Sequence, residues 1–267
     1  MKNTLLFKKA DMLMFWCVAL LLLSFSGNGY AQLLTENFSY TTAGPLQTAA
    51  SPNWVAHNGT SNYVQYTNTG LTFSGHAGSG VGGAATTATT GVGDHNRTFT
   101  SQNSGTVYMS CLVNITAAGT GADYFLHFNS SNFAARVGAV TSGTNLRFGI
   151  SKAGTPAAVT TTNFSLGTTY MLVVKYTFIA GASNDTVDLW VLPAFASTEA
   201  LAGAPLQSNS ASTDAASLSA VAIRQGSNSP AATIDAFRVG TSWADIAPSA
   251  SLINGGTTSA TAFATTY

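Results

Sequence analysis

The clearest alternation of apolar and polar positions lies in residues 168–193, TTYMLVVKYTFIAGASNDTVDLWVLP. Two apolar runs, residues 170–179 and 186–192, flank the segment GASND at 181–185. Side chains at alternate positions of a strand share one face, and Gly, Ser, Asn and Asp are residues that turns prefer. The pattern therefore predicts a β-hairpin whose first strand lies in the middle of a sheet.

Each strand of this hairpin has one continuous apolar face. The positions on it are Tyr170, Leu172, Val174, Tyr176 and Phe178 in the first strand and Val187, Leu189 and Val191 in the second. The opposite faces mix apolar side chains with polar ones such as Lys175 and Asp188. We expect the apolar face to pack into a core while the other face stays mixed.

Strand-like runs continue along the whole chain, with turn residues between them. They cover residues 33–38, 54–57, 63–66 and 71–73 as a hairpin, 96–100, 106–116, 123–129, 134–141, 146–151, 158–162, 218–225 and 233–239. After residue 31 the sequence has neither a long apolar pattern of helical period nor a fixed repeat. We expect an all-β fold, an antiparallel two-sheet β-sandwich or jelly roll.

The first residues follow a different pattern. A lysine-containing start precedes an apolar run at residues 12–25, and residues 29–31, GYA, have small residues at both positions that signal peptidases recognise. As a helix the run would span about 21 Å, less than a hydrocarbon core of roughly 30 Å. Residues 1–31 therefore predict a cleaved signal peptide, a secreted or cell-surface protein and no membrane span.

Composition narrows the range of partners. Charged residues make up 7% of the chain, with 10 Lys or Arg against 10 Asp or Glu, and no basic cluster is present. Nucleic acid and anionic lipid are therefore not expected as partners. Residues 32–248 have a length that fits one sandwich. Cys111, the one cysteine left after cleavage, is in phase with apolar neighbours, and we expect a buried, inert thiol.

After residue 248 the composition turns to Ser, Ala, Gly and Thr, which is typical of a linker. Residues 262–267 then alternate as a strand would, without a following segment to pair with. We expect residues 249–267 to be a linker and the start of a truncated further domain. Other domains of the same chain would then be partners of the sandwich.

Four stretches together resemble a known family. They are ENF at 36–38, NDTVDLWVLP at 184–193, IRQ at 223–225 and IDAFRVGTSW at 234–243. They are similar to the concanavalin A-like lectin/glucanase modules of the laminin-G-like jelly-roll kind. The resemblance covers roughly residues 33–246. It implies a lectin-like jelly roll in a multidomain bacterial protein exported by type IX secretion, and the tail from Leu252 resembles the immunoglobulin-like repeats that often follow.

A catalytic function needs acidic pairs that the sequence offers only weakly. Glycoside hydrolysis requires two carboxyl groups about 5 to 5.5 Å or ~6.5 to 9.5 Å apart. The chain after residue 31 has two glutamates, Glu36 and Glu199, and lacks the Glu-x-Asp-x-x-Glu motif of the related glucanases. Asp185 and Asp188 are three apart and point to opposite faces of a strand. Carboxylates from distant strands, Asp188 and Glu199 among them, can still converge, so a polysaccharide-cleaving enzyme stays an alternative.

Sugar binding would use an exposed aromatic face beside an amide, carboxylate or guanidinium. Trp190 with Asp188, and Tyr108 with Asn114, share strand faces and fit that demand. The alternative is that these rings cover a half-buried sheet face.

Metal ligands are sparse in the sequence. Oxygen ligands at Asp94, Asn96 and Asp185 could hold a structural Ca²⁺, although Asx turns use the same residues. The histidines lack the paired spacing of zinc ligands. The glycine-rich residues 75–83 have no strand–loop–helix context for phosphate, and we expect a flexible loop at the edge of a sheet.

These patterns together favour a non-catalytic, exported β-sandwich module that binds glycan or mediates adhesion within a larger protein. The alternatives are an extracellular glycoside hydrolase and a purely structural spacer.

Overall fold

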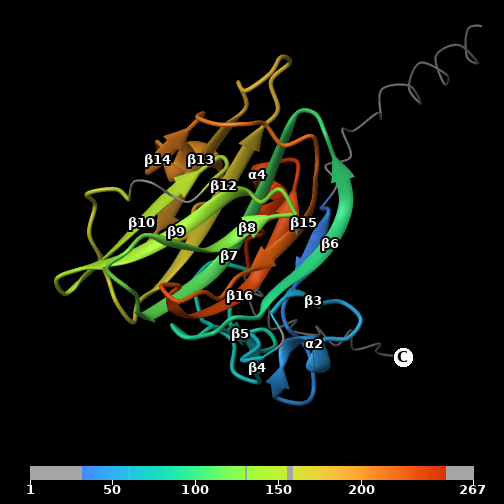
Figure 1. Cartoon of the computed structure of the whole chain (residues 1–267), viewed down its shortest axis with the longest axis vertical. Helices are drawn as coiled ribbons and strands as arrows, with labels where there is room; N and C mark the ends of the chain where they lie inside the picture. Colours follow the sequence, from blue (N-terminus) through green and yellow to red (C-terminus); the bar gives the residue numbers. More distant parts are fainter. Residues whose placement is uncertain (1–31, 60, 130, 155–158, 251–267) are drawn as a thin grey trace, which may run out of the picture. The chain divides into compact units, whose positions relative to one another are not determined.

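The computed structural model describes residues 32–59, 61–129, 131–154 and 159–250 (Figure 1). Their strands form two sheets in which neighbouring strands pair antiparallel, so the predicted two-sheet sandwich is confirmed. The signal peptide, the cleavage position and most of the predicted tail lie outside the described residues. Among the described residues, no helix is long and apolar enough to cross a membrane.

Sheet A has nine strands and contains the predicted hairpin. Its order is β14 (Gln207–Asn209), β13 (Thr186–Leu192), β12 (Thr169–Thr177), β7 (Thr106–Ala117), β16 (Ala231–Gly240), β5 (Ala84–Thr86), β4 (Gln65–Thr67) and β2 (Gly44–Pro45), with β1 (Leu34–Glu36) also on β16. β12 lies between β7 and β13, as the hairpin pattern predicted.

Sheet B has seven strands. Its order is β11 (Phe164–Ser165), β10 (Asn145–Ser151), β9 (Ala134–Ser142), β8 (Asp123–Phe128), β15 (Leu218–Ile223), β6 (Asp94–Gln102) and β3 (Val55–Asn58). Three single helical turns accompany the sheets: α2 (Leu46–Ala49), α3 (Glu199–Ala202) and α4 (Trp243–Ile246).

The main core lies between the two sheets. The apolar face predicted for the hairpin points into it, with Leu172 opposite Val191 and Val174 opposite Leu189 in register. Cys111 is buried in the same core, and that burial raises the pKa of its thiol well above the ordinary value. The period-two reading of the central strands and the buried thiol are therefore confirmed.

A second apolar cluster covers the outer face of sheet A, which the sequence left as a mixed face. Met171, Val173 and Trp190 from the hairpin pack there against Trp243 of α4 and Phe73 of the loop before β5. α4 begins at Ser242, whose side chain accepts from the backbone N–H of Asp245 in a capping box. This face of sheet A is thus a covered surface.

The glycine-rich segment forms part of this cover, which corrects the expectation of a flexible edge loop. Leu71 N donates to Asp235 Oδ2 at 2.8 Å, and a Cβ at Gly78 would lie 2.7 Å from the Cβ of Ala236. Residues 71–73 consequently serve as a covering loop, and the predicted hairpin of 63–66 with 71–73 is wrong. β4 pairs instead with β2 and β5.

Other differences concern short elements. Residues 159–162 are not a strand, and β11 lies just beyond them at Phe164–Ser165. The strands β2, β5 and β14 contain two or three residues each, too few for a visible alternation. Ser249 and Ala250, the first residues of the predicted linker, still pair with the covering loop through His76 and Gly75.

Candidate functional site

The aromatic residues that the sequence proposed as sugar platforms lie on the outer face of sheet A, under its cover. Trp190 is 3% exposed, and its Nε1 donates to the carbonyl oxygen of Gly203 at 2.9 Å. Trp243 packs edge-to-face on it, with ring centroids 5.4 Å apart. Trp190 therefore offers no open ring face to a ligand, because the cover that the sequence did not reveal takes that position.

Tyr108 is also buried and belongs to a polar group on the same face. Its hydroxyl donates to Glu199 Oε2 at 2.7 Å, and Lys175 Nζ donates to Glu199 Oε1 at 2.8 Å. Burial and the hydrogen bond to Glu199 raise the pKa of Tyr108 to about 12. Asp188 lies opposite Lys175 in register and accepts from Ser208 Oγ at 2.5 Å.

The structure does not bring Asn114 to Tyr108. The two residues are six apart on β7, which separates them by about 20 Å along the strand. Asn114 Nδ2 donates instead to the carbonyl oxygen of Gly167 at 2.8 Å.

The calcium candidates likewise fall in different places. Asp94 and Asn96 are on β6 of sheet B, whereas Asp185 precedes β13 of sheet A. Both oxygens of Asp185 accept hydrogen bonds, from Tyr176 and Ile179 at 2.7 Å each. Asp94 accepts from the backbone N–H of Gln225 at 3.1 Å. Among the described residues, no group of three or more His, Cys, Asp or Glu side chains is arranged to hold a metal ion.

The two glutamates of the catalytic alternative do not meet. Glu36 is buried on the inner side, where its carboxylate accepts from the backbone of Phe38 and the indole of Trp54 and forms an ion pair with Arg97. Glu199 is in the polar group outside sheet A. Asp188 and Glu199 both neighbour Lys175: Asp188 lies opposite it in register, and Glu199 forms an ion pair with it.

The outer face of sheet B is different. Aromatic rings gather there too, but some polar atoms beside them have no hydrogen-bond partner among the described residues. The side chains of His57, Tyr124, His127 and Phe133 form an aromatic cluster there. Phe133 and His127 have ring centroids 4.5 Å apart, and His57 is edge-on to His127 at 6.2 Å. His57 comes from β3, across the sheet from β8, so sheet B curves to bring these rings together.

Both histidines of the aromatic cluster are held neutral. Burial lowers the pKa of His127 to about 3, and its Nε2 has no hydrogen-bond partner among the described residues. Burial also lowers the pKa of His57, although Asp94 and Asn96 lie nearby and favour its protonated form. Neutral imidazoles pack here as aromatic rings.

Two guanidinium groups flank the ring of Tyr124. Arg224 lies 4.1 Å and Arg136 lies 4.9 Å from its centroid. Arg224 forms an ion pair with Asp123 at 2.8 Å. Arg136 donates from Nε to the carbonyl oxygen of Phe133 at 3.2 Å, and no carboxylate among the described residues pairs with it.

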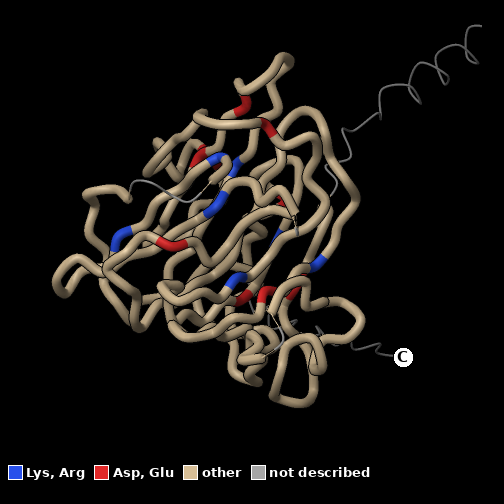
Figure 2. The backbone as a smooth tube through the Cα atoms, viewed as in Figure 1, with Lys and Arg blue, Asp and Glu red and all other residues tan. Residues whose placement is uncertain are grey.

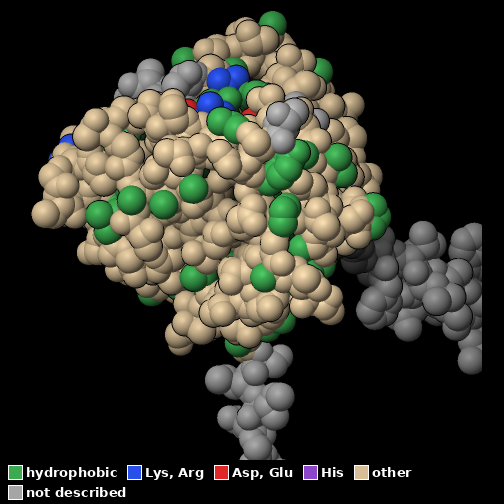
Figure 3. Space-filling view, turned by 60° about the horizontal axis from the view of Figure 1, so that its bottom comes forward, with side chains coloured by type: hydrophobic (Ala, Val, Ile, Leu, Met, Phe, Trp, Pro, Cys, Tyr) green, Lys and Arg blue, Asp and Glu red, His purple; other side chains and the backbone are tan. Residues whose placement is uncertain are grey.

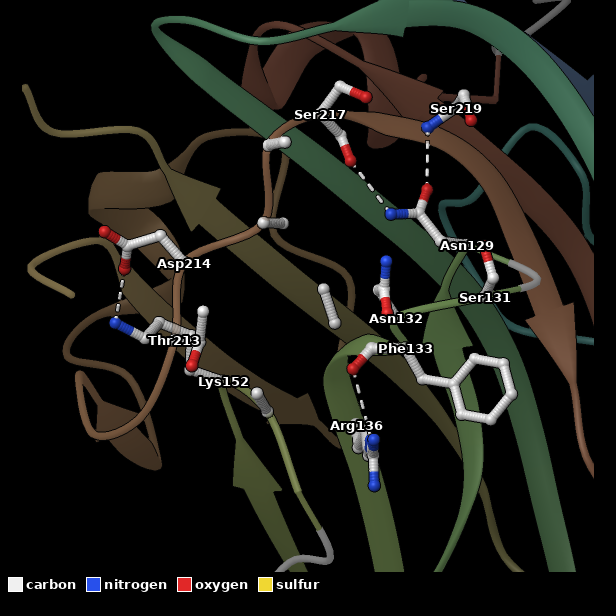
Figure 4. Close-up of a pocket in the computed structure, with 14 residues that line it drawn as sticks. Asn129, Ser131, Asn132, Phe133, Arg136, Lys152, Thr213, Asp214, Ser217 and Ser219 are labelled. Atoms are coloured by element: carbon white, nitrogen blue, oxygen red, sulfur yellow. Dashed lines mark hydrogen bonds and ion pairs between the residues drawn. The ribbon is translucent and has the colours of Figure 1, made fainter. Parts of the chain in front are cut away.

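A cavity of about 580 Å³ opens beside Arg136 and Phe133, between the β8–β9 turn and the segment before β15 (Figure 4). Six of its fourteen lining residues carry an amide or hydroxyl side chain, and alanines, Phe133 and three charged residues make up the rest. The labelled residues are Asn129, Ser131, Asn132, Phe133, Arg136, Lys152, Thr213, Asp214, Ser217 and Ser219. This volume is within the range of roughly 300 to 1,000 Å³ that small-molecule pockets occupy.

Two internal contacts fix the walls of this cavity. Asn129 donates from Nδ2 to the carbonyl oxygen of Ser217 and accepts at Oδ1 from Ser219 N, both at 2.9 Å. Lys152 Nζ donates to Asp214 Oδ1 at 2.6 Å with its side chain fully buried. Asn132 is exposed with φ of 50°, and its side chain has no hydrogen bond to any other described residue.

Sequence reasoning missed this site. Its signal was the turn of residues 129–133, NSSNF, where amides and hydroxyls precede a phenylalanine. Asn tolerates the left-handed backbone that such turns need, and both Asn129 and Asn132 adopt it. The turn was readable, but the segment 213–219 that closes the cavity is distant in the chain.

The few charges of the chain are dispersed over the two sheets (Figure 2). On the face seen in Figure 3, most of the surface is backbone and uncharged polar side chains, with scattered hydrophobic side chains. A ligand for such a surface would be recognised mainly by hydrogen bonds and ring contacts.

No protein-family model matches the chain, and no curated protein matches it. Similar solved structures include domain 4 of AbnA, an extracellular GH43 arabinanase from Geobacillus stearothermophilus in complex with arabinotriose, at 11% identity and TM-score 0.40, covering 79% of this chain and 100% of that one. A carbohydrate esterase from the Shiga toxin-encoding bacteriophage phi24B has 14% identity and TM-score 0.45, with 80% and 100% covered. Trypanosoma rangeli sialidase, in complex with the inhibitor DANA, has 12% identity and TM-score 0.39, with 71% and 30% covered. The sandwich assignment follows from the strand pairing described above.

Proposed function

We propose that this sandwich is a glycan-binding module whose ligand occupies the cavity beside Phe133. The observation that carries the proposal is the lining of the cavity, where amides and hydroxyls stand next to one half-buried aromatic ring. A sugar presents hydroxyl groups at its edges and C–H groups on its faces. Asn and Ser side chains can donate to and accept from the former, and the negative face of a ring attracts the latter.

Export belongs to the same proposal. The apolar run at residues 12–25 and the small residues at 29–31 support a cleaved signal peptide and a secreted or cell-surface location. An adhesive or anchoring role within a larger protein would use the same binding surface. Type IX export is supported by the sequence resemblance alone.

The test is binding of the full chain to a panel of uncharged and acidic polysaccharides by affinity electrophoresis and calorimetry. Phe133→Ala should weaken binding about tenfold, which corresponds to roughly 1.4 kcal/mol. Leu201→Ala is the matched control, because Leu201 is 72% exposed on α3 and is not among the residues that line the cavity. Its affinity should equal that of the wild type.

A second variant separates loss of binding from a folding defect in Phe133→Ala. Asn132→Gly removes the side-chain amide while keeping the left-handed backbone, which glycine adopts without strain. We expect a severalfold loss of affinity with an unchanged melting temperature. Failure of the full chain to bind any polysaccharide of the panel would overturn the proposed function and leave the spacer interpretation.

A further inference from the structure

Arg136 is a cation without a matching carboxylate at the mouth of the cavity. Its guanidinium lies over the rings of Tyr124 and Phe133, 4.9 and 5.5 Å from their centroids. Its one hydrogen bond to a described residue leaves from Nε, so the two terminal nitrogens are not engaged by the protein there. These nitrogens form the fork that recognises a planar anion in bidentate fashion.

The neighbouring charges do not neutralise Arg136. Asp123 is taken by Arg224, at 2.8 Å. Asp214 is taken by Lys152, and it also accepts from the backbone N–H groups of Asn184 and Asp185 at 3.0 Å each. The cavity lining therefore has two cations, Lys152 and Arg136, against the single carboxylate of Asp214.

A second guanidinium on the same ring adds to this surplus. Arg224 and Arg136 both lie against Tyr124, and their like charges repel. Burial, together with this repulsion, lowers the pKa of Arg136, so its charged form is under-solvated where it stands. Asp94 acts electrostatically on Arg224, and it is not among the groups that influence Arg136. An anion bound at Arg136 would pair with a guanidinium that no carboxylate of the described residues neutralises.

We propose that the ligand is an acidic glycan, and that a sugar carboxylate or sulfate ester pairs with the guanidinium of Arg136 at the mouth of the cavity. This inference rests on the proposed function, because it names the chemical class of the ligand for the same site. Asn132 and the nearby hydroxyls contact the uncharged part of the sugar, and Phe133 packs beside it. Arg136 thus supplies the charge that selects the ligand, because Lys152 and Asp214 of the lining pair with each other.

The experiment compares charged and uncharged forms of one polymer on the full chain. The pairs are polygalacturonate with its fully methyl-esterified form, which test a carboxylate, and dextran sulfate with dextran, which test a sulfate ester. We expect the charged member of at least one pair to bind about tenfold or more tightly, since a charge-assisted bidentate contact is strong. Arg136→Gln should remove that difference.

Arg147→Gln is the control for charge alone. Arg147 is also on sheet B, and its Nε donates to Asn163 at 2.9 Å outside the cavity lining. This variant loses the same unit of charge and should keep the preference for the charged polymer. An equal loss in both variants would mean diffuse attraction and would overturn the assignment to Arg136.

If Arg136→Gln melts well below the wild type, Arg136→Lys provides the test instead. Lysine keeps the charge over Tyr124 but lacks the planar fork, so the charged polymer should bind severalfold more weakly at an unchanged melting temperature. Equal binding of the charged and uncharged members would overturn this inference and leave the proposed function standing. Absence of binding to every polymer would overturn the proposed function itself, and this inference with it.

Discussion

The outer faces of the two sheets differ in whether their polar groups have partners and whether their aromatic rings are covered. On the outer face of sheet A, Trp243 packs edge-to-face on Trp190. Tyr108 and Lys175 both donate hydrogen bonds to Glu199. Over sheet B, rings also gather, but His127 keeps an unpartnered nitrogen. Arg136, beside these rings, pairs with no carboxylate in the described part of the chain, and a cavity opens next to it.

This difference separates architecture from a candidate site. Buried polar groups normally find partners, so a satisfied group such as Glu199 is explained by folding alone. A group left unsatisfied has a cost that packing does not explain, and this makes it informative about ligands. The aromatic content of the two faces is similar, and the state of their polar neighbours distinguishes them.

The largest expected effect comes from breaking the cover of sheet A. Trp190→Ala should lower the free energy of unfolding by about 3 to 5 kcal/mol, because it removes a buried indole and leaves a cavity under Trp243. Phe133→Ala, on the open face of sheet B, should lower it by only ~1 kcal/mol. Denaturant titration of both variants measures the contrast. Equal losses would show that the two faces are equally structural.

The second largest effect should be a difference in unfolding free energy between substitutions on the inner and outer faces of the hairpin. Leu172→Ala or Leu189→Ala should lower the free energy of unfolding by ~2 to 5 kcal/mol, because both leucines are fully enclosed in the main core. Lys175→Ala should cost about 1 kcal/mol or less, since its ion pair with Glu199 is partly exposed. Coincident denaturation midpoints for the three variants would contradict this facing.

The neutral histidines of sheet B should make the protein less stable at acid pH. The native state keeps the pKa of His127 near 3, whereas an unfolded histidine titrates near 6.5. The native state thus binds fewer protons between these values, and stability falls as the pH drops below about 6.5, by up to ~1.4 kcal/mol per pH unit. His127→Phe should flatten this slope in denaturation curves from pH 7 to 4. The other titratable groups that act on His127 are His57 and Arg136.

Asp235, under the cover of sheet A, provides a control of opposite sign. Burial raises its pKa to about 7, so the native state binds an extra proton between roughly pH 4 and 7. Its contribution to stability is present at low pH and is lost as the pH rises toward 7. Asp235→Asn should therefore steepen the acid slope that His127→Phe flattens. The same change of slope in both variants would contradict the two assigned shifts.

The sequence predicted the parts of the fold that depend on long regular alternation. The strands β7 and β10 and the hairpin repeat at period two over six or more residues, and their inner faces are confirmed in the core. The cover of sheet A was not predicted, since residues 68–83 have no period of their own. Met171, Val173 and Trp190 did carry a signal, because an apolar outer face needs something to bury it.

The candidate site was less predictable than the fold. Its walls come from the β8–β9 turn and from residues 213–219, which approach through β15 pairing with β8. A pattern along the chain cannot state which two loops meet. Nor could it show that Arg224 finds Asp123 while Arg136 stays without a carboxylate, because that depends on distances across the sheet.

The smallest expected effect belongs to the carboxylates of sheet A. A general acid in glycoside hydrolysis needs a raised pKa. Burial alone would raise the pKa of Glu199, but the hydrogen bonds from Lys175 and Tyr108 outweigh it and hold the carboxyl ionised. Asp188→Asn and Glu199→Gln should therefore change polysaccharide affinity by less than about twofold, which is below ~0.4 kcal/mol.

The same two variants decide the enzymatic alternative. Because Glu199 is held ionised, it is not prepared to donate a proton to a leaving sugar, and Asp188 already accepts a hydrogen bond from Ser208. We expect the wild-type chain to release no reducing sugar from the polysaccharide panel over a prolonged incubation. Release that disappears in Asp188→Asn or Glu199→Gln would place a catalytic site on sheet A. The covered face would then be the functional one, and the comparison between the two sheets would be reversed.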